Sequence, residues 1–329
     1  MKKESEVITN EKVSSKQNYS NSFRRIFVII SVEVLIVIGL SLLNPYFLTT
    51  RNILNVLRQS SFLFLVAIGQ TLVIITAGID LSVGTIVSIT GCAAAYFAII
   101  LNGNLAVAYT LGILLGGMVG FLSSMFIVVG NVVPFLATLS TSIIGYGVLL
   151  YVTKGVPIPP FLEFFSTLGR GYVGWIPIPI IIIIIIGIIF YIITSNTVFG
   201  KHIYAVGGNP NAARVSGINV KKIICCVYTI SGLLSGLAGV MLASRLDSGQ
   251  PTAGVGMELT AIAASVVGGA SFFGGEGSIY GTALGVLLIG IIGNGLNLLN
   301  ISSFLHQAII GIVIIIAVVV DQSAKRDSL

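Results

Sequence analysis

Residues 176–194 read IPIPIIIIIIIGIIFYIIT, a stretch without a single charged side chain. A helix that crosses a bilayer needs about 20 predominantly apolar residues, so this stretch predicts a transmembrane helix. The rest of the chain has the same character. Of its 329 residues, 55% are hydrophobic and only 9% are charged, whereas a soluble domain carries about 25% charged residues. The sequence therefore predicts an integral membrane protein.

Similar apolar runs recur along the chain, and they are long and continuous rather than short and alternating, so they predict helices and not a barrel. The predicted fold is all-α, with about ten transmembrane helices, the eighth of them short or re-entrant. Residues 1–25 are polar and predict a disordered tail, residues 26–322 the transmembrane domain, and residues 323–329 a second tail. The predicted spans are 26–43, 60–78, 81–101, 105–129, 132–152, 176–194, 223–243, 258–271, 279–299 and 303–320.

The basic residues predict the orientation of these spans. With ten spans both termini lie on one side, and that side receives 12 of the 17 basic residues. Loops rich in Lys and Arg stay in the cytoplasm, so both termini are expected there, and the spans in the plasma (inner) membrane. The 12 are Lys2, Lys3, Lys12, Lys16, Arg24, Arg25, Lys201, Arg214, Lys221, Lys222, Lys325 and Arg326; the other five are Arg51, Arg58, Lys154, Arg170 and Arg245.

The sequence offers no set of residues typical of an enzyme. It has no GxxxxGK[ST] loop to hold a nucleotide, and its GxGxxG match at 169–174 lies in a predicted external loop with no strand before it. The three cysteines lie in apolar stretches without the spacing of metal ligands. We therefore expect no enzymatic activity, no cofactor and no metal in this chain. The basic residues follow membrane topology, so they do not indicate nucleic-acid binding.

A carboxylate interrupts the apolar sequence between the second and third spans, within GIDLSVG at 78–84. A charge near the membrane is costly and usually has a role. Asp80 either marks a helix break beside the transport path or caps the next helix through its first amides. The two interpretations are compatible.

Uncharged polar residues could line a path for a neutral, hydroxyl-rich solute. Asn294, Asn297 and Asn300 share one helical face, which should point into protein or a water-filled path because lipid would not accommodate three amides. Gln70, Thr71 and Thr138 add polar groups in other spans. Hydrogen bonding between helices is the alternative role for all of them. Glycines spaced by four, at 112, 116 and 120 and at 232 and 236, predict close helix packing.

Residues 204–218, YAVGGNPNAARVSGI, lie in the longest predicted cytoplasmic loop. Asn209 can cap a short helix that begins at Pro210, and Gly217 can end it. Two adjacent spans need no such helix to join them, so this segment predicts a docking element for a cytoplasmic partner, with an ordinary amphipathic connector as the alternative. Its candidate contact residues are Gly207, Gly208, Asn209, Ala212, Ala213, Arg214 and Gly217, together with the apolar Val215.

Several of these segments together resemble the permease subunits of bacterial monosaccharide ABC importers, and most closely the ribose permeases. The resemblance covers about residues 30–322. It is carried, in chain order, by NIL at 52–54, LRQ at 57–59, TAGIDLSVG at 76–84, FLATL at 135–139, the whole of 204–218, QPTAG at 250–254, AIAA at 261–264 and NGLNLL at 294–299.

The resemblance implies a homodimer that encloses one path for the sugar, expected to be ribose. It also implies a cytoplasmic ABC ATPase, which binds ATP and Mg²⁺ and docks on residues 204–218, and an extracytoplasmic sugar-binding protein. The sequence departs from the family's pattern at Thr260, where the family has an acidic residue, and at Glu276 and Ser278, where it has basic ones. These departures leave the choice of sugar open.

Two further functions compete with this one. A secondary carrier driven by protons or sodium would need an ion site near the middle of the membrane, for which Glu33 and Asp80 are the only candidates. A passive channel or an assembly subunit, neither of which pumps, is the other. The short docking helix favours the ABC importer over both.

Overall fold

The computed structural model of the chain describes residues 26–315, except 28, 102, 161, 163, 303, 304, 306, 307, 310, 313 and 314. The described part is mainly helical and contains one small antiparallel sheet. In chain order it consists of the helix Ile29–Leu43, α2 (Thr50–Ile75), α3 (Val83–Ile100), α4 (Leu105–Val128), α5 (Pro134–Thr153), α6 (Thr167–Arg170), β1 (Tyr172–Val173), β2 (Ile176–Pro177), α7 (Ile178–Asn196), α8 (Val198–Gly208), α9 (Pro210–Val215), α10 (Val220–Leu246), α11 (Met257–Val267) and α12 (Ile279–Leu298).

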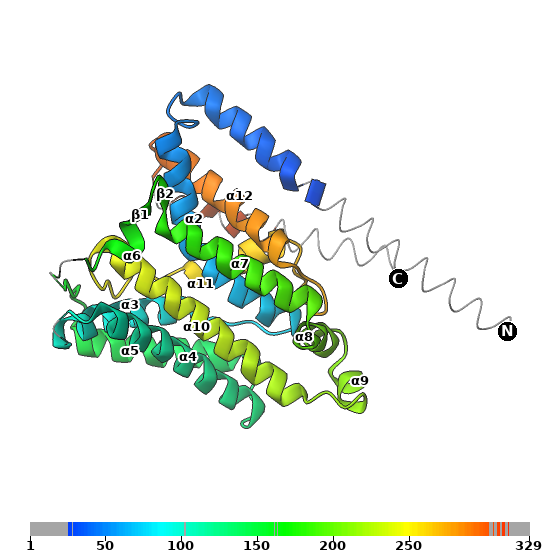
Figure 1. Cartoon of the computed structure of the whole chain (residues 1–329). Helices are drawn as coiled ribbons and strands as arrows, with labels where there is room; N and C mark the ends of the chain where they lie inside the picture. The colour runs from blue at the N-terminus through cyan, green and yellow to red at the C-terminus, as the bar shows by residue number, and fades with distance from the viewer. Residues whose placement is uncertain are drawn as a thin grey trace.

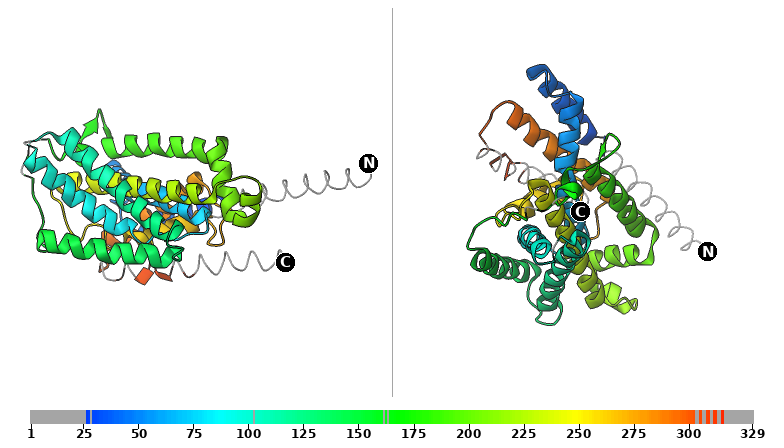
Figure 2. Two further views of the ribbon diagram at one scale, coloured as in Figure 1. Left: turned by 90° about the horizontal axis from the view of Figure 1, so that it is seen from below. Right: turned by 60° about the vertical axis from the view of Figure 1, so that its left-hand side comes forward.

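The long helices run between two ends of a bundle, as Figures 1 and 2 show. The β1–β2 hairpin and α6 lie at one end, here called the hairpin end, and α8 and α9 lie at the other, the α8–α9 end. Helix α2 connects the two ends. Near its start Arg58 donates a hydrogen bond to Tyr172 of β1, and at its last residue, Ile75, it meets α8 and the loop before α12.

Within the described residues, seven helices are long and apolar enough to cross a membrane: α2, α3, α4, α5, α7, α10 and α12. Two shorter apolar helices, Ile29–Leu43 and Met257–Val267, correspond to the first and eighth predicted spans. Eight of the ten predicted spans, the first and eighth included, agree with these helices to within four residues at each end. The tenth, 303–320, and the tails at 1–25 and 323–329 fall wholly or largely outside the described residues.

The predicted second span begins ten residues after the start of α2 at Thr50. The first turns of α2 carry Arg51, Asn52 and Arg58, which lower the local hydropathy. A prediction based on hydropathy therefore places the start of this helix too late. From Ser60 onwards nearly every residue of α2 is buried. Helix α2 is therefore at the centre of the bundle, in contact with α7, α10, α11 and α12.

The two glycine series pack against each other, which confirms the predicted close-packing faces. A Cβ on Gly116 of α4 would lie 2.5 Å from the carbonyl oxygen of Gly232 in α10, and one on Gly232 would lie 2.3 Å from the oxygen of Gly116. Gly120 likewise meets the carbonyl oxygen of Tyr228, at 2.3 Å. Small residues let membrane helices approach at the backbone, and here they join α4 to α10.

Candidate functional site

The chain breaks out of helix between α2 and α3, and Asp80 is buried at the centre of this break. Its Oδ1 accepts hydrogen bonds from the Ser82 amide (2.9 Å) and the Ser82 hydroxyl (2.6 Å). Its Oδ2 accepts one from Ser231 of α10 (3.0 Å). The carboxylate thus accepts a hydrogen bond from the amide of Ser82, just before α3, and not from the amides of the first turn of α3, as a helix cap would. Its bond with Ser231 connects the break to α10.

Two more of the predicted path residues meet Asp80 at this break. The side-chain amide of Gln70, on α2, donates to the backbone oxygen of Asp80 (3.0 Å) and accepts from its N–H (3.3 Å). The hydroxyl of Thr138, on α5, accepts from the N–H of Leu81 (3.1 Å) and lies 3.2 Å from the carbonyl oxygen of Ile79. Polar side chains of α2 and α5 thereby satisfy the backbone of the break, while Ser231 of α10 bonds the Asp80 carboxylate.

Thr71 faces a different neighbour from Gln70. Its hydroxyl oxygen lies 2.6 Å from that of Thr282 on α12 and 3.0 Å from that of Ser265 on α11. All three side chains are fully buried. This cluster joins α2 to α11 and α12, and the contacts within it fit hydrogen bonding between helices.

The asparagine face of α12 lies near the hairpin end. Asn294 pairs with Asn52 of α2 through two side-chain hydrogen bonds, of 2.8 and 2.9 Å. Asn297 is exposed. The six predicted path residues therefore fall into three places: Asp80, Gln70 and Thr138 together at the break, Thr71 between α2 and α12, and the two asparagines at the opposite end. Sequence reasoning missed Ser231 and Asn52, the distant partners of Asp80 and Asn294.

The short helix predicted within residues 204–218 is confirmed as α9. The side-chain oxygen of Asn209 accepts from the N–H groups of Asn211 and Ala212, both at 3.0 Å, and Pro210 is the first helical residue. Gly217 follows with φ +85°, a backbone angle that glycine adopts without strain. These local signals set both ends of the helix.

The predicted contact residues differ in their exposure. Gly208, Asn209, Ala212, Arg214 and Gly217 are exposed. Ala213 is buried, in an apolar cluster formed with α8 and α10, and Gly207 is buried against α2. Val215 is 90% exposed. Ala213 is the one buried residue of α9 and holds the helix in place, while the open surface consists of Pro210, Asn211, Ala212, Arg214 and Val215.

Three segments meet at Gly207, in what we call the Gly207 junction. A Cβ at Gly207 would lie 1.6 Å from the carbonyl oxygen of Ile75, the last residue of α2. The same oxygen accepts from the N–H of Gly275 (2.8 Å). Tyr204 donates its hydroxyl to the carbonyl oxygen of Gly277 (2.8 Å), and burial raises the pKa of this hydroxyl, with Tyr280 adding to the effect. Helix α8 is thus joined directly to α2 and to the loop before α12.

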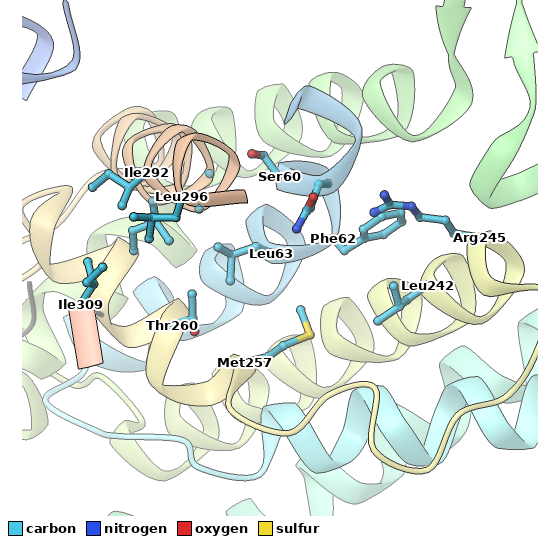
Figure 3. A pocket seen from close by; sticks show the side chains of 14 residues that line it. Ser60, Phe62, Leu63, Leu242, Arg245, Met257, Thr260, Ile292, Leu296 and Ile309 are labelled. Carbon is cyan, nitrogen blue, oxygen red and sulfur yellow. The ribbon is translucent and has the colours of Figure 1, made fainter. Parts of the chain in front are cut away.

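A cavity of about 310 Å³ opens among α2, α10, α11 and α12. Figure 3 shows the side chains that converge on it. None of the six predicted path residues lines it. Among the described residues, no group of three or more His, Cys, Asp or Glu side chains is placed to hold a metal ion.

Known proteins match this chain over most of its length. A family model described as branched-chain amino acid transport system / permease component matches residues 52–318. The ribose import permease protein RbsC of Bacillus subtilis is 46% identical over 291 residues, 88% of this chain and 90% of that protein. Its namesake from Haemophilus influenzae is 42% identical over 303 residues (91% and 92%). The D-allose transport system permease protein AlsC of Escherichia coli is 38% identical over 296 residues (90% and 90%). No solved structure matches the chain significantly.

Proposed function

Because the chain belongs to the family described as branched-chain amino acid transport system / permease component, we propose that it is the membrane-spanning subunit of an ABC importer for a monosaccharide, and that the sugar is ribose. The family makes it a transport subunit and not an enzyme, since ATP hydrolysis belongs to a separate ATPase. The observation that carries the choice of ribose is the pair of ribose import permeases that match about nine-tenths of the chain.

The proposed assembly contains two copies of the chain, a cytoplasmic ABC ATPase that binds ATP and Mg²⁺, and an extracytoplasmic sugar-binding protein. The α8–α9 end faces the cytoplasm and the hairpin end faces outward. The basic residues of the whole sequence support this orientation. The side predicted to hold both termini receives 12 of the 17, four of them at the α8–α9 end, whereas the other five lie at the hairpin end, and such residues concentrate on the cytoplasmic side.

Docking of the ATPase is proposed to occur on the exposed surface of α9. The exposed Val215 and Arg214 offer a partner an apolar contact and a charge. A movement imposed there would reach α8 through the buried Ala213 and then α2 through the Gly207 junction. The contacts therefore support a route by which ATP hydrolysis moves the central helix.

The proposed orientation predicts opposite labelling of two exposed positions. Trp175, between β1 and β2, is 74% exposed, and Val215 is 90% exposed. In intact cells a membrane-impermeant maleimide should label Trp175→Cys and leave Val215→Cys unlabelled, whereas both should react after permeabilisation. The unmodified chain is the control, since Cys92 is buried and Cys225 and Cys226 lie in the first turns of α10, at the α8–α9 end. Labelling of Val215→Cys alone in intact cells would show that the α8–α9 end faces outward and the hairpin end faces the cytoplasm.

The proposed transport path includes Asp80, Gln70, Thr71, Thr138, Asn294 and Asn297. Asn297 tests this proposal best because it is exposed, whereas Asn294→Leu would leave the amide of Asn52 without its partner. We expect Asn297→Leu to lower ribose uptake about three- to tenfold, through loss of one hydrogen bond to the sugar, with the amount of assembled complex unchanged. Uptake at the wild-type rate would show that Asn297 does not bind the sugar on its path.

ATP hydrolysis by the purified complex of permease, ATPase and binding protein tests the function and the substrate class together. Ribose should stimulate hydrolysis more than D-xylose or D-allose, and L-leucine should have no effect. Stimulation by leucine and not by any of the sugars would show that the family description, rather than the sugar permeases, indicates the substrate.

A further inference from the structure

The cavity lies in the half of the bundle that adjoins the hairpin end. Its lining comes from α2 near Ser60, from the last two turns of α10 at Leu242 and Arg245, from the first turn of α11 and from the second half of α12, and Ile309 adds one further side chain. In each of these four helices the lining residues lie mainly in the half nearer the hairpin end. In the proposed orientation a solute that arrives from outside would therefore meet this cavity early in its passage.

The lining carries polar groups that the protein itself leaves unused. The hydroxyl of Ser60 is buried, with 4% of the residue exposed, and has no hydrogen-bond partner in the described structure. The guanidinium of Arg245 lies 5.5 Å from the centre of the Phe62 ring, and Figure 3 shows these two side chains together. Throughout the described part of the chain, this guanidinium forms neither an ion pair nor a hydrogen bond. A buried hydroxyl without a partner is costly, and the half-buried Arg245 keeps its donors available at the cavity, so the two groups point to a ligand.

Two further side chains complete a mixed set of donors and acceptors. The hydroxyl of Thr260 donates to the carbonyl oxygen of Gly256 (2.9 Å) and can still accept a hydrogen bond. The amide of Gln59 both donates and accepts, and it is exposed at the cavity. A sugar hydroxyl also donates and accepts hydrogen bonds, so Thr260 and Gln59 can each form a hydrogen bond with a sugar hydroxyl.

We propose that this cavity is an outer binding site for the transported monosaccharide, which deepens the proposed function and rests on it. Small-molecule sites have volumes of about 300–1,000 Å³ and combine an apolar lining with a few polar groups. A cavity of about 310 Å³ is at the small end of that range, which suits a single sugar ring. An amino acid fits less well, because the lining contains Arg245 but no carboxylate to balance an ammonium group.

Gly293 offers a way to fill the cavity without disturbing the helices. It lines the cavity, and a Cβ built on it meets no heavy atom within 4 Å. Gly290, one turn earlier on α12, behaves differently, since its Cβ would lie 2.3 Å from the Ser60 hydroxyl. Gly293→Leu should therefore occupy the cavity and keep the fold. Gly147→Leu is the matched control, as Gly147 is an exposed helical glycine on α5 with equally open space and no part in the lining.

The first experiment measures ribose uptake by the complete transporter. Gly293→Leu should reduce uptake at least tenfold, while Gly147→Leu should leave it unchanged. Ser60→Ala should reduce it about three- to tenfold, the effect of one hydrogen bond. Its matched control is Ser235→Ala, which also removes a buried hydroxyl that lacks a partner but lies outside the cavity. Copurification of the ATPase with each variant separates loss of the site from loss of the complex.

The second experiment detects the sugar without requiring transport. A membrane-impermeant maleimide added from outside should label Gly293→Cys, and ribose should slow the labelling, whereas L-leucine should not. The unmodified chain is the control for the native cysteines. If wild-type transporter moves ribose while Gly293→Leu is fully active and Gly293→Cys is unprotected, the cavity is not a sugar site and the proposed function stands. If the wild type moves leucine and leucine protects Gly293→Cys, both proposals are wrong.

Discussion

Gly207→Ala is expected to disrupt the permease severely, and Gly208→Ala is expected to leave it folded. The added methyl group at Gly207 would lie 1.6 Å from the carbonyl oxygen of Ile75 and 2.7 Å from the amide nitrogen of Gly275. Both are backbone atoms, so no side chain can turn away to make room. Overpacking a buried contact costs about 1–3 kcal/mol or more, and here it would also part α8 from α2.

Thermal unfolding of the detergent-purified permease measures this effect. Gly208 is the matched control because it is the next residue of α8 and a Cβ on it meets nothing within 4 Å. Replacing glycine by alanine within a helix is slightly favourable, by about 0.5–1 kcal/mol. We therefore expect a lower midpoint for Gly207→Ala and an unchanged or slightly higher midpoint for Gly208→Ala. Equal midpoints would mean that the Gly207 junction does not stabilise the permease.

Val215→Asp combined with Arg214→Glu is expected to release the ATPase from a permease that remains folded. Both side chains are exposed, so their replacement should cost the permease little stability. At an interface, loss of a central apolar contact and reversal of a charge cost about 2 kcal/mol or more, which corresponds to roughly thirtyfold weaker binding. Copurification of the ATPase with tagged permease should therefore be largely lost.

A charge reversal at the opposite end of the bundle provides the control. Arg51→Glu makes the same change of charge at an exposed position of the hairpin end, and it should leave copurification intact. If the α9 double variant retains the ATPase fully, the docking site does not lie on α9, and the loop before α12 is the next candidate.

Ala213→Glu would be a poor test of docking, although the sequence makes it an attractive one. The sequence places Ala212, Ala213, Arg214 and Val215 on one short helix, and its signals at Asn209, Pro210 and Gly217 predict that helix correctly because caps are local. Which side of the helix is covered depends on α8 and α10, which no local signal specifies. The structure buries Ala213 against them, so a glutamate there would perturb packing before it affected a partner.

The same division between local and long-range information applies to the rest of the molecule. Composition and apolar runs predict the membrane helices, and glycine spacing predicts faces that pack closely. Three contacts of the structure join residues far apart in the sequence, and no local pattern predicts them. They are the close packing of Gly116 on Gly232, the hydrogen bond from Ser231 to Asp80 and the hydrogen bonds between Asn52 and Asn294. The cavity depends on four helices at once, and Ser60 and Arg245 carry no pattern in the sequence that marks them as neighbours.

Uptake by proteoliposomes tests the central claim most directly. The permease, its ATPase and the binding protein are reconstituted so that ATP is available on the side of the ATPase, and labelled ribose is added on the side of the binding protein. The account predicts that ribose accumulates against its gradient, that accumulation requires ATP hydrolysis, and that excess unlabelled L-leucine does not compete. Accumulation of leucine in place of ribose, or ribose entry that is independent of ATP, would contradict it.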